Sequence, residues 1–76
     1  MAKIPRISAD KMASALRRDG FVEHHQKGSH LVMVHPERHR RTSVPMHSGT
    51  LRVGTIHKIL VEAGLTVEDL IRLLED

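Results

Sequence analysis

The 76-residue chain contains no cysteine, tryptophan or tyrosine and only one phenylalanine. Without cysteine, neither a disulfide framework nor a thiolate metal site is available. The shortage of aromatic rings argues against domains that stack unpaired bases on aromatic side chains. Long apolar runs are also missing, since the longest, Leu31–Val34, is too short for a membrane span or signal peptide. We therefore expect one cytoplasmic domain over residues 1–76, with no membrane contact and a core of Leu, Ile, Val and Met.

The charges that are present are divided unevenly along the chain. Residues 1–58 carry eleven Lys or Arg against four Asp or Glu, a balance of +7. Residues 59–76 carry one against five, a balance of −4. A basic body of this kind favours a polyanionic partner, although ordinary solvated surface charge produces the same pattern.

Local signals predict a first helix from Ser8 to Asp19. Ser8 is a typical N-cap, because its hydroxyl can accept a hydrogen bond from the first turn. Gly20 is typical of a helix end that takes left-handed backbone, and Phe21 can then fold back onto the helix.

Three extended segments follow, at residues 21–26, 30–35 and 41–44, with a turn at residues 36–39. Their spacing predicts two consecutive hairpins and hence an antiparallel sheet. The middle segment is apolar on both faces, which indicates a central strand covered at least partly on each side. Its more polar neighbours are then the edge strands.

Helical periodicity returns after a loop from Met46 to Val53, with apolar residues at Ile56, Ile59, Leu60 and Ala63. Gly64 ends this helix. Residues 66–69 (Thr-Val-Glu-Asp) indicate a capping box that opens a short last helix. The whole order predicts an α+β fold with helices packed on one face of a small sheet.

The tripeptide Gly28-Ser29-His30 suggests chemistry, because it follows Lys27 and sets a histidine at the start of a strand. Imidazole can take and return a proton near neutral pH. RNA supplies its own nucleophile, the 2′-OH, so a ribonuclease needs a base, an acid and donors for the phosphate charge. His30 is the candidate base, and Lys27 with the backbone N–H groups of Gly28 and Ser29 are candidate donors. The same residues also fit a simple turn followed by a structural histidine.

Other polar residues leave further alternatives open. His47 is either a second proton-transfer group or a partner for a loop carbonyl. The cluster of Arg38, Arg40 and Arg41 is either a phosphate-binding patch or a hairpin tip kept soluble by its charge. We expect the remaining histidines on the surface: His24, His25, His35, His39 and His57. No two histidines lie on one predicted helix at the spacing of a zinc site with a neighbouring carboxylate, so we expect no metal and no other cofactor.

Four pieces of the chain together resemble the HicA (YcfA-like) family of bacterial toxins: Leu16…Gly20-Phe21, Lys27-Gly28-Ser29-His30, Val44-Pro45…His47 and Gly54-Thr55…Ile59-Leu60…Ala63-Gly64-Leu65. The resemblance covers nearly the whole chain. It implies a fold like that of double-stranded-RNA-binding domains (helix, three-stranded antiparallel sheet, helix), here with a short extra helix. It also implies cleavage of mRNA with one catalytic histidine, His30, and a HicB-like antitoxin that covers the active face. Two features depart from the pattern: Met46 replaces a frequent basic residue, and the turn at residues 36–40 is unusually positive.

These observations lead to one main hypothesis and two alternatives. The main hypothesis is a toxin that acts as a ribosome-independent, metal-independent RNA endonuclease, with RNA contacts from Lys27, Gly28, Ser29, Arg40, Arg41 and His47. The first alternative is a non-catalytic RNA- or protein-binding module in which His30 is structural. The second is a structural partner whose exposed sheet or acidic last helix docks another chain. Loss of His30 separates them, because a binding module tolerates it and a nuclease does not.

Overall fold

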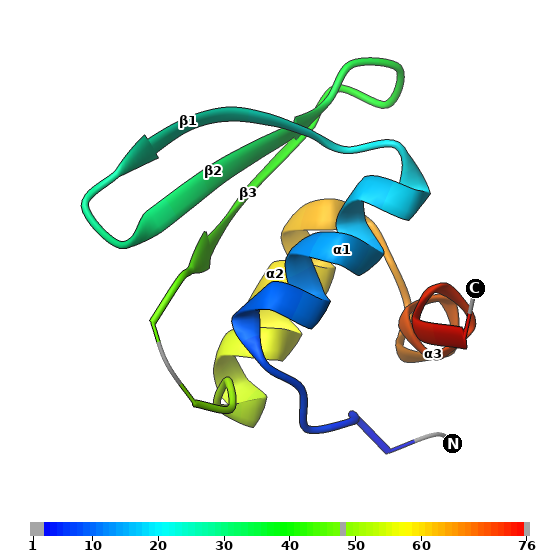
Figure 1. Cartoon of the computed structure of the whole chain (residues 1–76). Coiled ribbons are helices and arrows are strands. Elements are labelled where there is room, and N and C mark those ends of the chain that lie inside the picture. The colour runs from blue at the N-terminus through cyan, green and yellow to red at the C-terminus, as the bar shows by residue number, and fades with distance from the viewer. Residues whose placement is uncertain (1–2, 48, 76) are drawn as a thin grey trace.

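The computed structural model describes residues 3–47 and 49–75, which form three helices and three strands (Figure 1). In chain order these are α1 (Ala9–Asp19), β1 (Val22–Lys27), β2 (His30–His35), β3 (Arg40–Pro45), α2 (Val53–Ala63) and α3 (Val67–Glu75). The predicted α+β order is confirmed, with α3 as the extra helix. The ends predicted for β1 and β3 and the predicted start of α2 each differ from the structure by one residue. Ser48, within the predicted loop, lies outside the described residues.

Both ends of α1 form as the sequence predicts. Ser8 has extended backbone, and its Oγ accepts a hydrogen bond from the Lys11 backbone N–H at 3.3 Å. At the other end Gly20 takes left-handed backbone with φ 115°, and the Phe21 N–H donates to the Leu16 carbonyl at 2.9 Å. This closure turns the chain sharply and places Phe21 under the start of the sheet.

The capping box that begins α3 is also confirmed. The Asp69 backbone N–H donates to Thr66 Oγ1, and the Thr66 N–H donates to Asp69 Oδ2, both at 3.0 Å. The bond from the Thr66 backbone, supported by its hydroxyl and by Arg72, lowers the pKa of the Asp69 carboxyl. A hydrogen bond of 2.7 Å from Arg18 Nη1 to the Leu73 carbonyl then ties α3 to α1.

The sheet has the order β1-β2-β3, with both pairs antiparallel. His30, the first residue of β2, is opposite Lys27 on β1 and Pro45 on β3. Directly opposite residues of an antiparallel pair share a face of the sheet. Lys27, His30 and Pro45 therefore form one row at the end of the sheet where the β1–β2 turn lies, which we call the His30 row.

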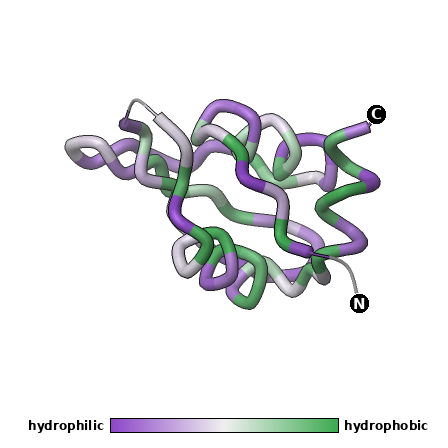
Figure 2. Tube along the Cα trace, turned by 90° about the horizontal axis from the view of Figure 1, so that it is seen from below, coloured by the Kyte–Doolittle hydropathy of each residue, from purple (hydrophilic) through white to green (hydrophobic). Residues whose placement is uncertain are grey.

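Helices α1 and α2 lie on one side of the sheet, and α3 packs against α1 (Figure 1). Side chains alternate along β2: Leu31 and Met33 face the helices and belong to the core, whereas His30 is exposed. On the opposite face Val32 keeps only 8% exposure, which agrees with the prediction of a central strand covered at least partly on each side. Figure 2 shows hydrophobic and hydrophilic residues interspersed along the helix α3, next to the C-terminus.

The core is aliphatic, as the composition predicts, and contains one aromatic ring. Its largest fully buried side chains are Phe21, Met12, Leu16, Met33, Leu51, Ile56, Ile59, Leu70 and Val44. Every element except β1 contributes to this core. No helix in the described part of the chain is both long and apolar enough to cross a membrane.

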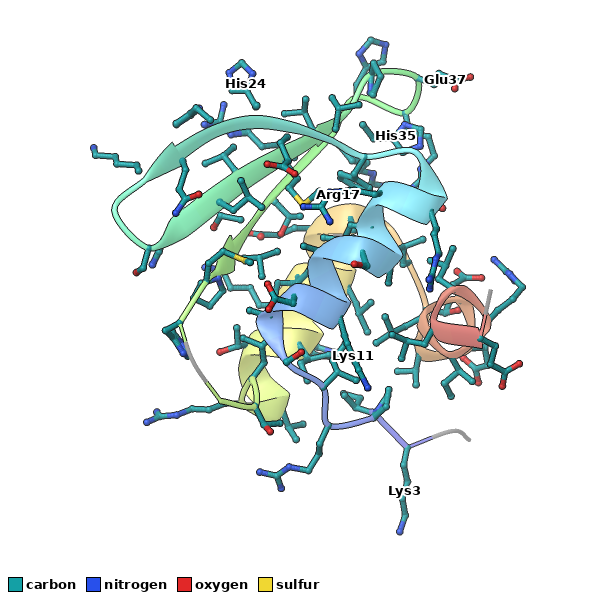
Figure 3. The ribbon with its side chains drawn as sticks, in the orientation of Figure 1. Lys3, Lys11, Arg17, His24, His35 and Glu37 are labelled. Atoms are coloured by element: carbon teal, nitrogen blue, oxygen red, sulfur yellow. The ribbon has the colours of Figure 1, made fainter. Side chains whose placement is uncertain are left out.

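The prediction that His35 lies on the surface is wrong, since this residue is only 5% exposed. The alternation that buries Leu31 and Met33 continues to the end of β2 and turns His35 toward the helices as well. The Arg38 N–H donates to His35 Nδ1 at 3.1 Å, so Nε2 holds the ring proton and donates to the Asp19 carbonyl at 3.0 Å. Figure 3 shows His35 beside the end of α1.

The other four histidines expected on the surface are exposed: His24, His25, His39 and His57. In Figure 3 the side chain of His24 projects from β1 away from the helices.

Arg38, which the sequence grouped with Arg40 and Arg41, has a structural role. Its Nη2 contacts Asp19 Oδ2 at 2.7 Å and the Ala63 carbonyl at 2.9 Å, and the guanidinium lies 5.8 Å from the centre of the Phe21 ring. The hydrogen bond with Asp19 raises the pKa of Arg38. Arg38 thus joins the β2–β3 turn to the ends of α1 and α2, and its charge is already paired.

The contact between Gly20 and His35 leads to a prediction for stability. A Cβ at Gly20 would lie 2.7 Å from His35 Nε2, whereas one at Gly49 would meet nothing within 4 Å. Both residues have positive φ, 115° and 96°, so alanine at either position costs about 1–3 kcal/mol of backbone strain. We expect Gly20→Ala to lose a further 1–3 kcal/mol, roughly the cost of overpacking. Equal losses for the two variants in urea denaturation would contradict this packing role of His35.

Candidate active site

The β1–β2 turn fixes the position of His30. Gly28 has φ 59°, and Gly28-Ser29 is the whole loop between the two strands. A two-residue loop with glycine at its first position is typical of a type II′ hairpin turn, whose twist matches that of the strands. The Ser29 carbonyl accepts a hydrogen bond from the Met46 N–H, which ties the turn to the segment after β3. His30 is therefore an exposed side chain on a well-supported backbone.

Next to His30 the surface forms a groove of about 480 Å³. One wall comes from the start of β2 and from β3, and the opposite wall comes from the first turns of α2; the segment between β3 and α2 closes the end. The residues that line it are Ser29, His30, Ser43, Pro45, His47, Thr50, Leu51, Arg52, Thr55, Lys58 and Ile59. A groove of this size and polarity suits a small polar ligand or part of a larger one.

The groove has a positive character. Its lining includes Arg52, Lys58 and two histidines, and no Asp or Glu. In the described part of the chain the ion pairs are Arg17–Glu23, Arg38–Asp19 and Arg72–Asp69, so neither Arg52 nor Lys58 is neutralised by a carboxylate.

Helix α2 adds to this character. It begins at the groove with Arg52 as N-cap, without a side-chain cap hydrogen bond and without an acidic residue in its first turn. The positive end of the helix dipole therefore points toward the groove. The arrangement favours an anion.

The structure brings together most of the residues predicted for the site. Ser29, His30 and His47 line the groove, Lys27 stands beside His30 in the His30 row, and Gly28 forms the turn between them. The side chain of His47 is exposed. These residues come from sequence segments up to 20 positions apart, and the hairpin and the segment after β3 unite them.

Arg40 and Arg41 lie elsewhere. They pair with His35 and Val34 at the far end of β2, about 14–17 Å along the strand from His30. Figure 1 shows the β1–β2 and β2–β3 turns at opposite ends of the sheet. The guanidinium of Arg40 also lies against Gly64, where an added Cβ would be 3.0 Å from its Nε. Contact of these two arginines with RNA stays a prediction, but they do not share the groove with His30.

The sequence did not predict five polar residues of the lining as site residues: Ser43, Thr50, Arg52, Thr55 and Lys58. The last three come from the start of α2. The helical periodicity of the sequence carries a signal for two of them. Thr55 and Lys58 flank the buried stripe of Ile56 and Ile59, so the helical periodicity that predicts the stripe also predicts their place at its rim.

The groove offers a set of groups that suits reactions at phosphate. An exposed imidazole can transfer protons, while the cations and N–H groups can stabilise negative charge on a phosphoryl oxygen. In the described residues no group of three or more His, Asp or Glu side chains is placed to hold a metal ion. The imidazole, cations and N–H groups of the groove can supply proton transfer and anion binding.

None of the curated proteins matches this chain. A family model described as HicA toxin of bacterial toxin–antitoxin matches residues 9–65. The match extends from the first residue of α1 to just beyond Gly64, and it includes His30 and both walls of the groove. It covers well over half of the chain and agrees with the fold order that the sequence resemblance implied. The chain therefore belongs to the HicA toxin family of bacterial toxin–antitoxin systems.

Proposed function

We propose that this toxin is an RNA endonuclease and that His30 carries its proton transfers. The observation that carries the proposal is the position of His30 at a positive groove. Among the described residues, no Asp or Glu lines this groove. A phosphodiester is the ligand that best fits such a groove, because it is anionic and its cleavage needs the proton transfer and charge stabilisation that these groups can provide. Membership of the toxin family supports the same activity.

The proposed reaction uses the 2′-OH of RNA as its nucleophile. His30 accepts the 2′-OH proton as the 2′-oxygen forms a bond to phosphorus. The bond between phosphorus and the 5′-oxygen breaks, and the departing oxygen takes a proton from the imidazolium of His30 or from His47. Lys27 and the N–H groups of Gly28 and Ser29 stabilise the charge that develops on the phosphoryl oxygens. The products are a 2′,3′-cyclic phosphate and a 5′-hydroxyl, and no metal ion is required.

The family also implies an antitoxin as the partner of this toxin. We propose a HicB-like protein that binds over the His30 row with an acidic surface. Lys27 and His30 are both exposed, so a partner can cover them without unfolding any part of the toxin. The antitoxin then blocks RNA by occupying the same surface.

The first prediction concerns His30. We expect His30→Ala to lower cleavage of single-stranded RNA by about 10²–10⁴-fold, the usual contribution of a positioned acid–base group. Its thermal midpoint should match the wild type, because His30 is exposed. His39→Asn is the matched control: this exposed histidine lies in the far turn at φ 55°, a backbone conformation that asparagine tolerates. A His30→Ala variant that cuts RNA at the wild-type rate would contradict the role of His30 in proton transfer. A wild-type protein that binds RNA without cutting it would instead identify a binding module.

The second prediction concerns the nucleophile. Cleavage should continue in EDTA, and the upstream product should end in a 2′,3′-cyclic phosphate or the phosphate derived from it. An oligonucleotide with 2′-O-methyl groups throughout should remain intact, because it lacks the attacking hydroxyl. Activity that disappears in EDTA and returns only with Mg²⁺ or Zn²⁺ would contradict the mechanism, as would cleavage of the methylated strand.

The third prediction concerns the antitoxin. On the inactive His30→Ala protein, RNA and a HicB-like antitoxin should displace each other, and Lys27→Gln should weaken the binding of both. Fluorescence anisotropy with labelled RNA measures this competition directly. A stable ternary complex of toxin, RNA and antitoxin would exclude occlusion as the means of inhibition.

A further inference from the structure

The α2 wall of the groove contains a cation that the proposed reaction does not use. Lys58 is exposed on the second turn of α2, and it lines the groove opposite the strands that carry His30. The core residue Ile59 follows it in the helix and anchors this part of α2 beneath the sheet. The side chain of Lys58 therefore projects from a rigid element into an open, solvated space.

The nearest carboxylate along α2 is directed elsewhere. Glu62 is one helical turn beyond Lys58, a spacing that often produces an ion pair. Here Glu62 Oε1 instead accepts a hydrogen bond of 2.8 Å from Thr42 Oγ1. In the described part of the chain Lys58 forms no ion pair. Its charge is thus available to a ligand in the groove.

We propose that Lys58 binds a backbone phosphate of the RNA next to the phosphate that is cleaved. This inference rests on the proposed function, because it takes His30 as the point of cleavage. An RNA strand with its reacting phosphate at His30 then crosses the groove from the His30 row to α2. Lys58 acts as a positioning residue: it holds the strand and does not touch the reacting atoms.

The remaining lining agrees with recognition of the RNA backbone. Three hydroxyl side chains, Ser43, Thr50 and Thr55, can bond to phosphate or ribose oxygens. No Phe, Tyr or Trp lines the groove, so base stacking of the usual kind contributes little. Contacts to phosphate carry no sequence information, so the strand should bind with little base preference.

A path toward Arg41 is less favourable. Beyond the groove along β3, a second hollow is lined by Val32, Arg41, Thr42, Ser43 and Glu62. A strand that continued from His30 toward Arg41 would pass the carboxylate of Glu62. The path toward Lys58 meets no acidic side chain among the residues that line the groove.

The test compares Lys58→Gln with Lys11→Gln. Both variants lose one exposed lysine from a helix, but Lys11 projects from α1 and does not line the groove (Figure 3). Binding of a labelled 2′-O-methyl oligonucleotide is measured at several salt concentrations, together with kcat and KM on cleavable RNA. Lys58→Gln should weaken binding about two- to fivefold, the range for one exposed ion pair. It should also lower the slope of log affinity against log salt by about 0.7, the value for one phosphate on a single strand.

The expected effect on cleavage is a higher KM with kcat nearly unchanged. Lys58→Arg should keep the wild-type slope, which separates loss of the charge from damage to α2. If Lys58→Gln behaves like Lys11→Gln while the wild type still cleaves RNA, the inference about Lys58 is wrong and the proposed function stands. A loss confined to kcat, or a slope that falls for Arg41→Gln and not for Lys58→Gln, would also overturn it. A wild-type protein that neither binds nor cuts RNA would overturn both proposals.

Discussion

The alternation of side chains along β2 is the constraint on which the rest of the structure depends. Leu31 and Met33 must face the helices, because they complete the core with α1 and α2. A slip of one residue would turn both outward and expose their apolar surface, so the pairing with β1 and β3 has only one favourable register. The same parity turns His30 out of the core, where its side chain is exposed. The burial of two hydrophobic residues thus fixes the position of the histidine that we assign to catalysis.

At the other end of β2 the same alternation buries a histidine, His35. His35 enters the helix side of the sheet, where it binds the backbone of Asp19 and Arg38 and forms a T-shaped contact with the Phe21 ring at a centroid distance of 5.2 Å. Arg38 extends this contact to the end of α2. One strand therefore carries a buried histidine that holds the fold together and an exposed histidine placed for chemistry.

The distribution of acidic residues gives the groove its charge. Asp19 and Glu23 pair with arginines near the end of α1, and Glu62 binds Thr42. None of these carboxylates lines the groove beside His30. The basic body that the composition indicates is therefore not evenly basic in three dimensions: some of its cations are used within the fold, and Arg52 and Lys58 are left at the groove.

The sequence predicts the elements well because their ends carry local signals. Ser8, Gly20 and the Thr66–Asp69 box each act through hydrogen bonds within a few residues. The site at residues 27–30 could also be predicted from the sequence, since the turn and the start of the strand are adjacent in the chain. The α2 wall of the groove could not be predicted in this way, because Lys58 is 28 positions from His30. Only the packing of α2 beneath β3 brings the two residues to one groove. His35 was missed because a polar residue at a strand end gives no local sign of burial.

The central claim is that RNA binds in the groove beside His30. It is tested most directly by backbone NMR spectra of the wild-type protein during titration with a 2′-O-methyl RNA oligonucleotide, which binds without being cut. Our account predicts chemical-shift changes at Ser29, His30, His47, Thr55 and Lys58, which line the groove, and little change at Lys11, which does not. Changes that cluster at Arg40 and Arg41, with the signals of His30 and Lys58 unmoved, would contradict it.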